Sequence, residues 1–270
     1  MRGIAKLKIG ILTKRKNGFT GKIKDYLQKH GHTVELLLED NLMIDNTLLN
    51  NDFYILKSKQ LIYLYAAYFL VANNIIVIPD VPISHIYKDR VDSYLALHKN
   101  AFLTPRVYIG TANTFKTQLK KEMYPFIMKP IMGSGSKGVR IINSINDLNL
   151  NSDEILYLEE YIEGIHYLVY FIEDNLCICE KKPLANEHEK VKIIANDEEI
   201  KKLAFKWKNT AHVMFGHVDM VRQSSTNNLY IVDVGTFPEF SNWKGEINPV
   251  EKISELILNK YTELVRNGIE

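Results

Sequence analysis

The chain has 270 residues, of which 46% are hydrophobic and 24% are charged. These proportions are typical of a folded globular protein and exclude collagen-like, mucin-like and disordered classes. Lys and Arg number 34 against 32 Asp and Glu, a net charge of +2 that gives no general attraction to nucleic acid or anionic membranes. We therefore expect neither as a partner, and the length predicts two or three packed lobes.

The cysteines and the most apolar segment bear on the cellular compartment. Cys177 and Cys179 stand two positions apart in a strand-like run, so they share one face and do not readily form a disulfide. We expect buried thiols in a reducing cytoplasm. The first residues do not resemble a secretory signal, and the apolar segment 61–72 is too short to span a bilayer. It is predicted to be a buried helix.

The first third of the chain alternates β-branched runs with helical patterns, which favours a small α/β lobe with a parallel sheet. Strands are expected at 7–12, 33–38, 53–56 and 75–78, and helices near 20–29 and 60–72. The turn at 13–18 lacks a G-x-G-x-x-G fingerprint, so no dinucleotide site is predicted there. Pro79 and Pro82 exclude a regular helix between the lobes and predict a connector, with a boundary near residue 84.

Further along, a helix at 88–99, a strand from 104 and a helix at 113–121 are expected. Strands then come in neighbouring pairs with hairpin spacing, which predicts antiparallel sheets. The expected pairs are 125–129 with 138–142, 157–161 with 167–172, and 216–222 with 229–234. Helices at 198–209 and 250–266 complete an α+β body.

A small-residue loop follows the strand that ends at Lys129. Its glycines let backbone N–H groups approach a ligand, and its serines and lysine add donors, so the loop could fold over phosphates. The alternative is a flexible hairpin turn with an exposed lysine, since the loop lacks the P-loop pattern. The loop residues are Gly133, Ser134, Gly135, Ser136, Lys137 and Gly138.

An acidic strand end contains Glu159, Glu160, Tyr161 and Ile162. An extended segment of this kind can bind a planar base through main-chain hydrogen bonds, with a carboxylate accepting from an exocyclic amine. The alternative is an acidic strand end that faces water.

Two aspartates lie within apolar runs of the last predicted hairpin. If Thr226 is near the centre of the turn, Asp219 and Asp233 are opposite each other on one face. Facing carboxylates repel unless they share a cation, and Mg²⁺ prefers oxygen ligands. Alternatively, one aspartate is exposed or neutralised by Lys or Arg.

These three features, in this order and spacing, resemble the ATP-grasp superfamily, particularly its RimK-like and glutathione-synthetase-like members, over about residues 85–265. The resemblance implies that Arg90, Lys129 and Lys181 contact the phosphates of ATP and that Asp219 and Asp233 hold Mg²⁺. It also implies that the glycine-rich loop covers the phosphates and that 159–162 binds adenine. The expected fold is a parallel-sheet N-terminal domain (1–84), a subdomain with the glycine-rich loop (85–157) and a C-terminal subdomain with the metal site (158–270).

The sequence departs from the family pattern at several positions. Gly235 stands where most relatives have the asparagine of an E-x-N motif, so a second Mg²⁺ would need another oxygen donor, of which Glu239 is the nearest. His166 stands where many relatives have an acidic residue for the ribose, and His217 where relatives often have Arg. Together with Lys181, His217 and Arg222 are the catalytic candidates.

The resemblance implies a ligase in which ATP phosphorylates a carboxylate and an amine or thiol then displaces phosphate from the acyl phosphate. The substrates would be a small-molecule carboxylate and an amine. A homodimer is one open alternative for the oligomeric state, since dimers are common among similar proteins. Two alternatives remain open. One is a small-molecule kinase resembling the inositol-phosphate kinases, for which the basic residues 14–16 are a hint. The other is a nucleotide-binding protein without turnover, which the glycine at 235 would explain.

Overall fold

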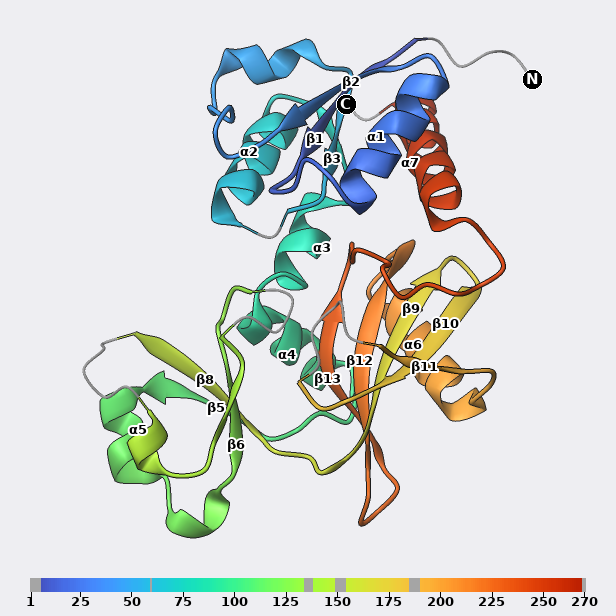
Figure 1. Cartoon of the computed structure of the whole chain (residues 1–270). Coiled ribbons are helices and arrows are strands. Elements are labelled where there is room, and N and C mark those ends of the chain that lie inside the picture. Colours follow the sequence, from blue (N-terminus) through green and yellow to red (C-terminus); the bar gives the residue numbers. More distant parts are fainter. Residues whose placement is uncertain (1–5, 59, 134–137, 149–153, 185–189, 269–270) are drawn as a thin grey trace.

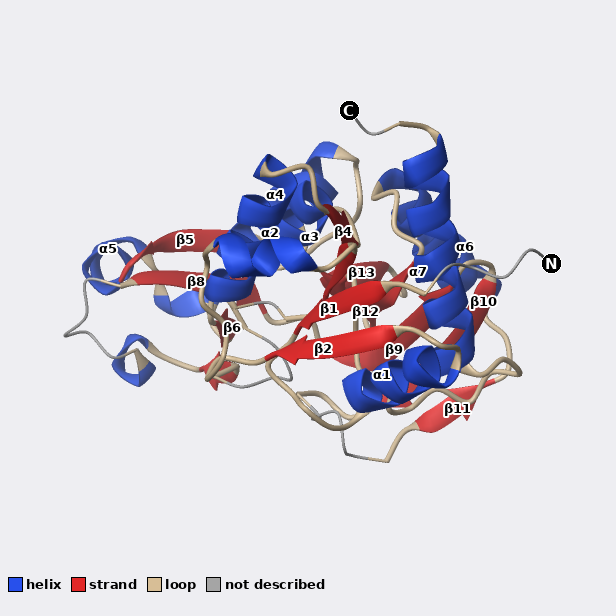
Figure 2. Ribbon diagram, turned by 90° about the horizontal axis from the view of Figure 1, so that it is seen from above, coloured by secondary structure: helices blue, strands red, loops and turns tan. Residues whose placement is uncertain are grey.

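Three sheets make up the fold, and Figure 1 shows the chain passing through them in order. The structure is a computed structural model and describes residues 6–58, 60–133, 138–148, 154–184 and 190–268. Figure 2 shows the middle sheet, with β5 and β8, extending to one side of the other two. This arrangement confirms the predicted fold class, a parallel N-terminal sheet followed by antiparallel sheets.

The N-terminal lobe is a four-stranded parallel sheet with the strand order β2-β1-β3-β4. Its strands and helices are β1 (Lys8–Leu12), α1 (Phe19–Lys29), β2 (Thr33–Leu37), a 3-10 helix (Asn46–Asn50), β3 (Phe53–Leu56), α2 (Leu61–Ala72) and β4 (Ile76–Ile78). Helix α2 buries only one face, with Tyr63 and Leu70 fully buried but Tyr65 56% exposed. The segment predicted to be a buried helix is therefore half exposed. None of the helices in the described ranges is long and apolar enough to cross a membrane.

The connection to the second lobe is helical. Helix α3 (Val81–Ile86) begins where the two prolines predicted an irregular connector, and that prediction is wrong. Pro82 falls in the first turn, where a backbone N–H has no partner within the helix, so proline costs nothing there. The Asp80 side chain caps the helix by accepting from the backbone N–H of Ile83. Helix α4 (Arg90–Lys99) follows and is capped by Asp89 in the same way.

The middle sheet has the order β5-β8-β6-β7 and is antiparallel. Its elements are β5 (Val107–Thr111), α5 (Ala112–Gln118), a 3-10 helix (Lys121–Met123), β6 (Phe126–Lys129), β7 (Arg140–Ile142), a 3-10 helix (Ile145–Asp147) and β8 (Ile155–Glu160). The predicted hairpin of 125–129 with 138–142 is confirmed as the β6–β7 pair.

The C-terminal sheet has the order β11-β10-β9-β12-β13 and is also antiparallel. Its elements are β9 (Gly164–Ile172), β10 (Asn175–Lys181), β11 (Lys192–Ile194), α6 (Glu198–Thr210), β12 (Phe215–Gln223) and β13 (Leu229–Gly235). The predicted pairing of 216–222 with 229–234 is confirmed.

The predicted hairpin of 157–161 with 167–172 is wrong. Strand β8 has β5 on one side and β6 on the other, so both of its edges are occupied. The chain leaves the middle sheet after Glu160, and β9 pairs with β10 and β12 in the C-terminal sheet. Residues 161–163 therefore form a hinge between two sheets, which places them at the cavity described below.

The C-terminal helix returns to the N-terminal lobe. Helix α7 (Pro249–Arg266) packs against α1 and β4, and α1 and α7 lie side by side in Figure 1. Ile253 and Ile257 are fully buried in the cluster that contains Ile9 and Phe53 of the parallel sheet. Helix α6 covers the other face of the C-terminal sheet, where Trp207 is fully buried. Helix α7, with 18 residues, thus joins the N-terminal lobe to the C-terminal sheet.

Both cysteines lie on β10 as free thiols, buried in the same cluster as α7. Their Sγ atoms are 3.9 Å apart, as expected for residues two apart on one face of a strand. The prediction of buried thiols is confirmed.

We expect Ile257→Ala to lower the free energy of unfolding by about 2–5 kcal/mol, because it removes a fully buried side chain between α7 and the parallel sheet. Urea unfolding monitored by circular dichroism measures the change. Val265→Ala, at a position 54% exposed on the same helix, is the control and should change stability by less than about 0.5 kcal/mol. Equal effects of the two substitutions would contradict the packing of α7 on the first lobe.

Candidate functional site

A cavity of about 600 Å³ lies where the three sheets meet. The loops after β1 and β3, the start of α4, the ends of β6 and β8, and one face of β9, β10, β12 and β13 all contribute to its walls. Most of the residues predicted from the sequence line it. They are Arg90, Lys129, Gly133, Glu159, Glu160, Tyr161, Ile162, His166, Lys181, His217, Asp219, Asp233 and Glu239.

Asp219 and Asp233 are directly opposite each other on β12 and β13, which confirms the predicted register. The ladder is irregular between Asp219 and Met220, so the two carboxylates sit beside a β-bulge. Asp219 Oδ2 lies 3.0 Å from Lys181 Nζ, and Asp233 Oδ2 lies 3.6 Å from Arg90 Nη2. Each carboxylate therefore has an acidic and a basic neighbour, as the alternative of neutralisation by Lys or Arg predicts.

The aspartates fit a hard cation. Asp219 Oδ1 is buried and has no hydrogen-bond partner within the described part of the chain, so one carboxylate oxygen still requires a donor or a cation. Oxygen donors of this kind suit Mg²⁺. Across the described residues no group of three or more His, Cys, Asp or Glu side chains could hold a metal. Mg²⁺ at Asp219 and Asp233 would therefore depend on water and ligand oxygens as well.

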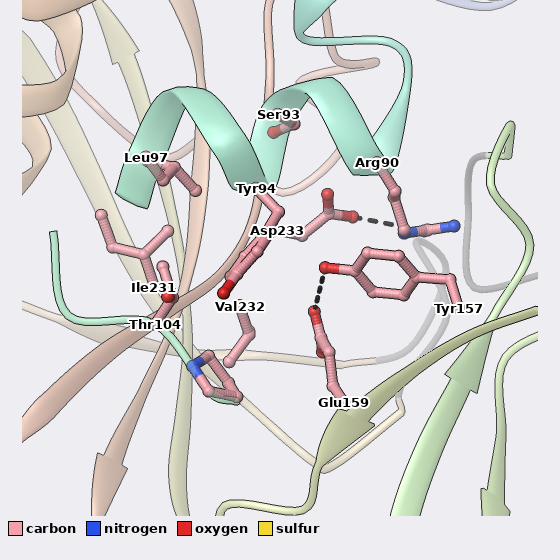
Figure 3. Close-up of a pocket in the computed structure, with 11 residues that line it drawn as sticks. Arg90, Ser93, Tyr94, Leu97, Thr104, Tyr157, Glu159, Ile231, Val232 and Asp233 are labelled. Atoms are coloured by element: carbon pink, nitrogen blue, oxygen red, sulfur yellow. Dashed lines mark hydrogen bonds and ion pairs between the residues drawn. The ribbon is translucent and has the colours of Figure 1, made fainter. Parts of the chain in front are cut away.

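Lys129 and Glu159 form a buried ion pair on neighbouring strands of the middle sheet, with 9% and 6% of their side chains exposed. Lys129 Nζ also donates to the Val232 carbonyl at 2.7 Å, and the Tyr157 hydroxyl donates to Glu159 Oε1 at 3.2 Å (Figure 3). Burial, with the Glu159 charge, raises the pKa of Tyr157, so the hydroxyl stays protonated and keeps donating. The alternative in which this strand end faces water is wrong for Glu159.

The hinge after Glu159 uses some of its backbone groups within the fold. The N–H groups of Glu160 and Tyr161 donate to the carbonyls of Arg106 and Pro125. A base bound here would therefore use the hinge carbonyls or the Ile162 peptide group, rather than those two N–H groups.

Arg90 begins α4 and reaches across to the strand that precedes the glycine-rich loop. Its guanidinium donates to the Pro130 carbonyl and pairs with Asp233, and Figure 3 shows it pointing toward that aspartate. A Cβ on Gly133 would lie 3.6 Å from Arg90 Nη1, so the loop starts against this cation. Gly138, at the other end of the loop, has φ +75°, a conformation that favours glycine. Ser134, Gly135, Ser136 and Lys137 lie outside the described residues.

Comparison with known families agrees with this geometry. Residues 87–235, more than half of the chain, match the model of the ATP-grasp domain. The chain therefore belongs to the ATP-grasp family. Among curated proteins, none matches the sequence.

Solved structures of ATP-grasp proteins share the fold at low sequence identity. D-alanine–D-alanine ligase from Bacillus anthracis, complexed with ATP, is 16% identical with a TM-score of 0.68, and the match covers 97% of this chain and 99% of that one. A RimK domain ATP-grasp protein from Sphaerobacter thermophilus is 12% identical with a TM-score of 0.68, over 84% and 90%. The ATP-grasp ligase PsnB, complexed with a minimal precursor, Mg and ADP, is 11% identical with a TM-score of 0.65, over 94% and 98%. At such identities these likenesses show the fold alone.

His166, on β9, faces the ATP-grasp cavity between Lys181 of β10 and Val221 of β12. Burial, and then the charge of Lys181, lowers its pKa to about 4, so the imidazole is neutral near pH 7. Its buried Nε2 has no partner among the residues described. A neutral ring nitrogen without a partner can make a hydrogen bond to a ligand hydroxyl, which is compatible with the predicted contact to a ribose.

His217 fills the space beside Gly235, the position at which most relatives have an asparagine. The two residues are cross-strand partners on β12 and β13. A Cβ built on Gly235 would lie 3.0 Å from Nδ1 of His217 and closer still to Cε1, so the imidazole occupies the space that a side chain at 235 needs. The imidazole at 217 and a side chain at 235 would therefore compete for one space.

The structure does not bring Arg222 into the cavity. Its guanidinium lies 3.0 Å from Asp197 and 2.5 Å from Glu199, at the start of α6, on the opposite face of the sheet. A signal for this was present in the sequence: Arg222 is an odd number of residues from Asp219, and successive side chains of a strand alternate between faces. Its role in the described structure is to tie α6 to β12.

Glu239 lines the cavity, but its carboxylate is paired with the N-terminal lobe, 2.9 Å from Lys57 Nζ. From the sequence, only the basic residues 14–16 of the loop after β1 were linked to a site, as a hint of the acceptor pocket of a kinase, and the loop after β3 was not. The clue available was their position, because the carboxyl ends of neighbouring parallel strands meet at one edge, where ligands bind. The additional lining residues there are Thr13, Lys14, Arg15, Lys57, Ser58 and Gln60.

The lowered pKa of His166 predicts part of the dependence of stability on pH. The unfolded chain takes up a proton as the pH falls through about 6.5, whereas the native state does so only near pH 4. This group therefore removes stability as the pH falls through that window. We expect urea unfolding of His166→Gln to show a smaller loss between pH 7 and pH 5 than wild type. The exposed His98→Gln should match wild type, and the same result for both variants would contradict the burial of His166.

The contact between His217 and position 235 predicts non-additive effects. Gly235→Ala should lower the free energy of unfolding by about 1–3 kcal/mol, because the new methyl group overlaps the imidazole. In a His217→Ala background the same change should cost much less. Chemical denaturation of the four proteins of this double-mutant cycle measures the coupling. Additive effects would mean that the ring does not fill this space.

Proposed function

We propose that the protein is an ATP- and Mg²⁺-dependent ligase that joins a carboxylate to an amine through an acyl phosphate, in the manner of RimK-like enzymes. The observation on which the proposal rests is that three cations and two opposed carboxylates line one cavity. The cations are Arg90, Lys129 and Lys181, and the carboxylates are Asp219 and Asp233.

The three cations are placed to bind and neutralise phosphate oxygens. Each is held against a carboxylate or a carbonyl and is largely shielded from water, with 11%, 9% and 15% of the side chain exposed. In such a site a fixed positive charge acts strongly on the charge that spreads over a transferring phosphoryl group, and little reorganisation is needed.

Asp219 and Asp233 would hold Mg²⁺, which would neutralise phosphate charge in the bound nucleotide. The structural neighbour PsnB was solved with Mg and ADP, which supports the use of Mg²⁺ and an adenine nucleotide by this chain. His217, beside Asp219 on the cavity wall, is placed to contact the reacting groups.

The chemistry needs no covalent nucleophile from the protein. A substrate carboxylate oxygen attacks the γ-phosphorus of ATP, the bond to the β-phosphate oxygen breaks, and ADP leaves. The amine then attacks the acyl carbon, phosphate departs, and the amine loses a proton. The residues of the cavity position the reactants and exclude water, and its volume of about 600 Å³ suits ligands of this size.

We expect Lys129→Ala to weaken Mg·ATP binding by about 1.5–3 kcal/mol, roughly 10- to 150-fold, through loss of a charge-assisted contact. Thermal unfolding with and without Mg·ATP measures it, since ligand at 100 times its dissociation constant stabilises by about 2.7 kcal/mol. Because Lys129→Ala leaves Glu159 buried without this partner, the Lys129→Gln/Glu159→Gln variant is tested in parallel. Lys116→Ala, exposed on α5, is the control. Unchanged affinity in both site variants would contradict the assignment of Lys129.

Turnover tests the reaction itself. With carboxylic acids, ATP, Mg²⁺ and hydroxylamine as a general amine nucleophile, we expect wild type to form hydroxamates and release phosphate. Asp233→Asn should abolish both, because it removes a charge at nearly constant volume. Hydroxamate trapping distinguishes the ligase from the kinase, which would give a stable phosphorylated product without hydroxamate. Full activity of Asp233→Asn would mean that the metal lies elsewhere.

A further inference from the structure

A second charged cluster lies on the N-terminal side of the cavity and has no part in the phosphate site. The carboxylate of Glu239, in the segment between β13 and α7, lies 2.9 Å from Lys57 Nζ and 3.9 Å from Arg15 Nη1. The three residues line the cavity, although 182 positions separate Lys57 from Glu239 in the chain.

The same carboxylate also accepts a hydrogen bond from the backbone N–H of Phe19, the first residue of α1. Helix α1 has Gly18 at its N-cap and no side chain that caps it from there. A Cβ on Gly18 would lie 3.4 Å from Glu239 Oε2, so the glycine leaves room for the carboxylate against the helix end. Glu239 therefore caps the N-terminus of α1 from outside the helix.

Burial makes this arrangement selective for an anion. Only 9% of the Lys57 side chain and 18% of the Glu239 side chain are exposed, whereas half of the Arg15 side chain is exposed. Lys57 is held in place by the Phe237 carbonyl, at 2.8 Å from its Nζ. Burial by itself raises the pKa of Glu239, yet Lys57 and Arg15 hold the pKa below its ordinary value, so the carboxylate is ionised.

We propose that Arg15, Lys57 and the Phe19 N–H form a carboxylate-recognition site for the acid substrate, and that Glu239 occupies this site until the substrate binds. This inference rests on the proposed ligase function, since it adds a second anionic group to the carboxylate that is phosphorylated. The acid substrate is therefore a dicarboxylate or an acidic amino acid or peptide.

The donors fit a carboxylate better than a phosphate. One ammonium, one guanidinium and one peptide N–H surround a planar, singly charged group in the described structure. A substrate carboxylate that replaces Glu239 leaves the charge of the site unchanged, whereas a dianionic phosphate that replaces Glu239 adds one negative charge. The site lies at the carboxyl ends of β1 and β3, the edge of a parallel sheet where ligands bind.

The test measures anion binding in the absence of nucleotide. Dicarboxylates from malonate to adipate are compared with valerate and inorganic phosphate by calorimetry or thermal unfolding. The series varies the distance between the two carboxylates, so that one member matches the distance that the cavity requires. We expect the best dicarboxylate to bind wild type at least fivefold more tightly than valerate. Arg15→Gln should weaken this binding at least fivefold. Lys16→Gln removes the same charge from an exposed position of the same loop outside the cavity lining, and it should leave the binding unchanged.

Dicarboxylate binding by the Glu239→Gln variant is the decisive measurement. If Glu239 competes with the substrate for this site, the variant binds the dicarboxylate at least fivefold more tightly than wild type, a gain that a purely structural role would not produce. Unchanged or weaker binding in Glu239→Gln, equal losses in Arg15→Gln and Lys16→Gln, or tighter binding of phosphate with the same dependence on Arg15 each overturn the proposal. Mg·ATP binding by the same proteins is measured separately, so failure of the nucleotide site is distinguished from failure of this one.

Discussion

The pairing of opposite charges inside the cavity is the interaction on which the rest of the structure depends. Four cations lie against four carboxylates, and in most of these pairs the partners come from elements far apart in the chain. The pairs are Arg90 with Asp233, Lys129 with Glu159, Lys181 with Asp219, and Lys57 with Glu239. Removing one partner would leave a charge buried and unpaired, which costs far more than an exposed ion pair contributes.

This pairing explains how one cavity can hold so many charged side chains in the absence of a ligand. In the proposed reaction, phosphate oxygens would replace the carboxylates as partners of the cations, and a divalent cation would bind the released carboxylates. The net charge of the site would then stay nearly balanced. The two oxygens of Asp219 differ in this respect. Lys181 pairs with Oδ2, whereas the buried Oδ1 has no partner in the described structure.

The packing around the cavity keeps these charges in register. Helix α7 joins the N-terminal lobe to the C-terminal sheet through one apolar cluster, and the hinge after Glu160 joins the middle sheet to the same C-terminal sheet. Much of the cavity wall is thus built on strands of the C-terminal sheet, whose other face is covered by α6. A site on such elements is positioned more accurately than one built on loops alone.

Local sequence patterns determined much of the fold of this protein. Hydrophobic alternation and turn spacing predicted the parallel lobe, the β6–β7 and β12–β13 hairpins and the opposition of Asp219 to Asp233, because a short turn fixes the register of its two strands. The pairing of His217 with Gly235 follows from the same register. Only the tertiary structure decided that β8 and β9 lie in different sheets and that Glu239 reaches Lys57. These contacts join segments whose separation in sequence carries no spacing signal, so burial of the surrounding faces, rather than local preference, selects them.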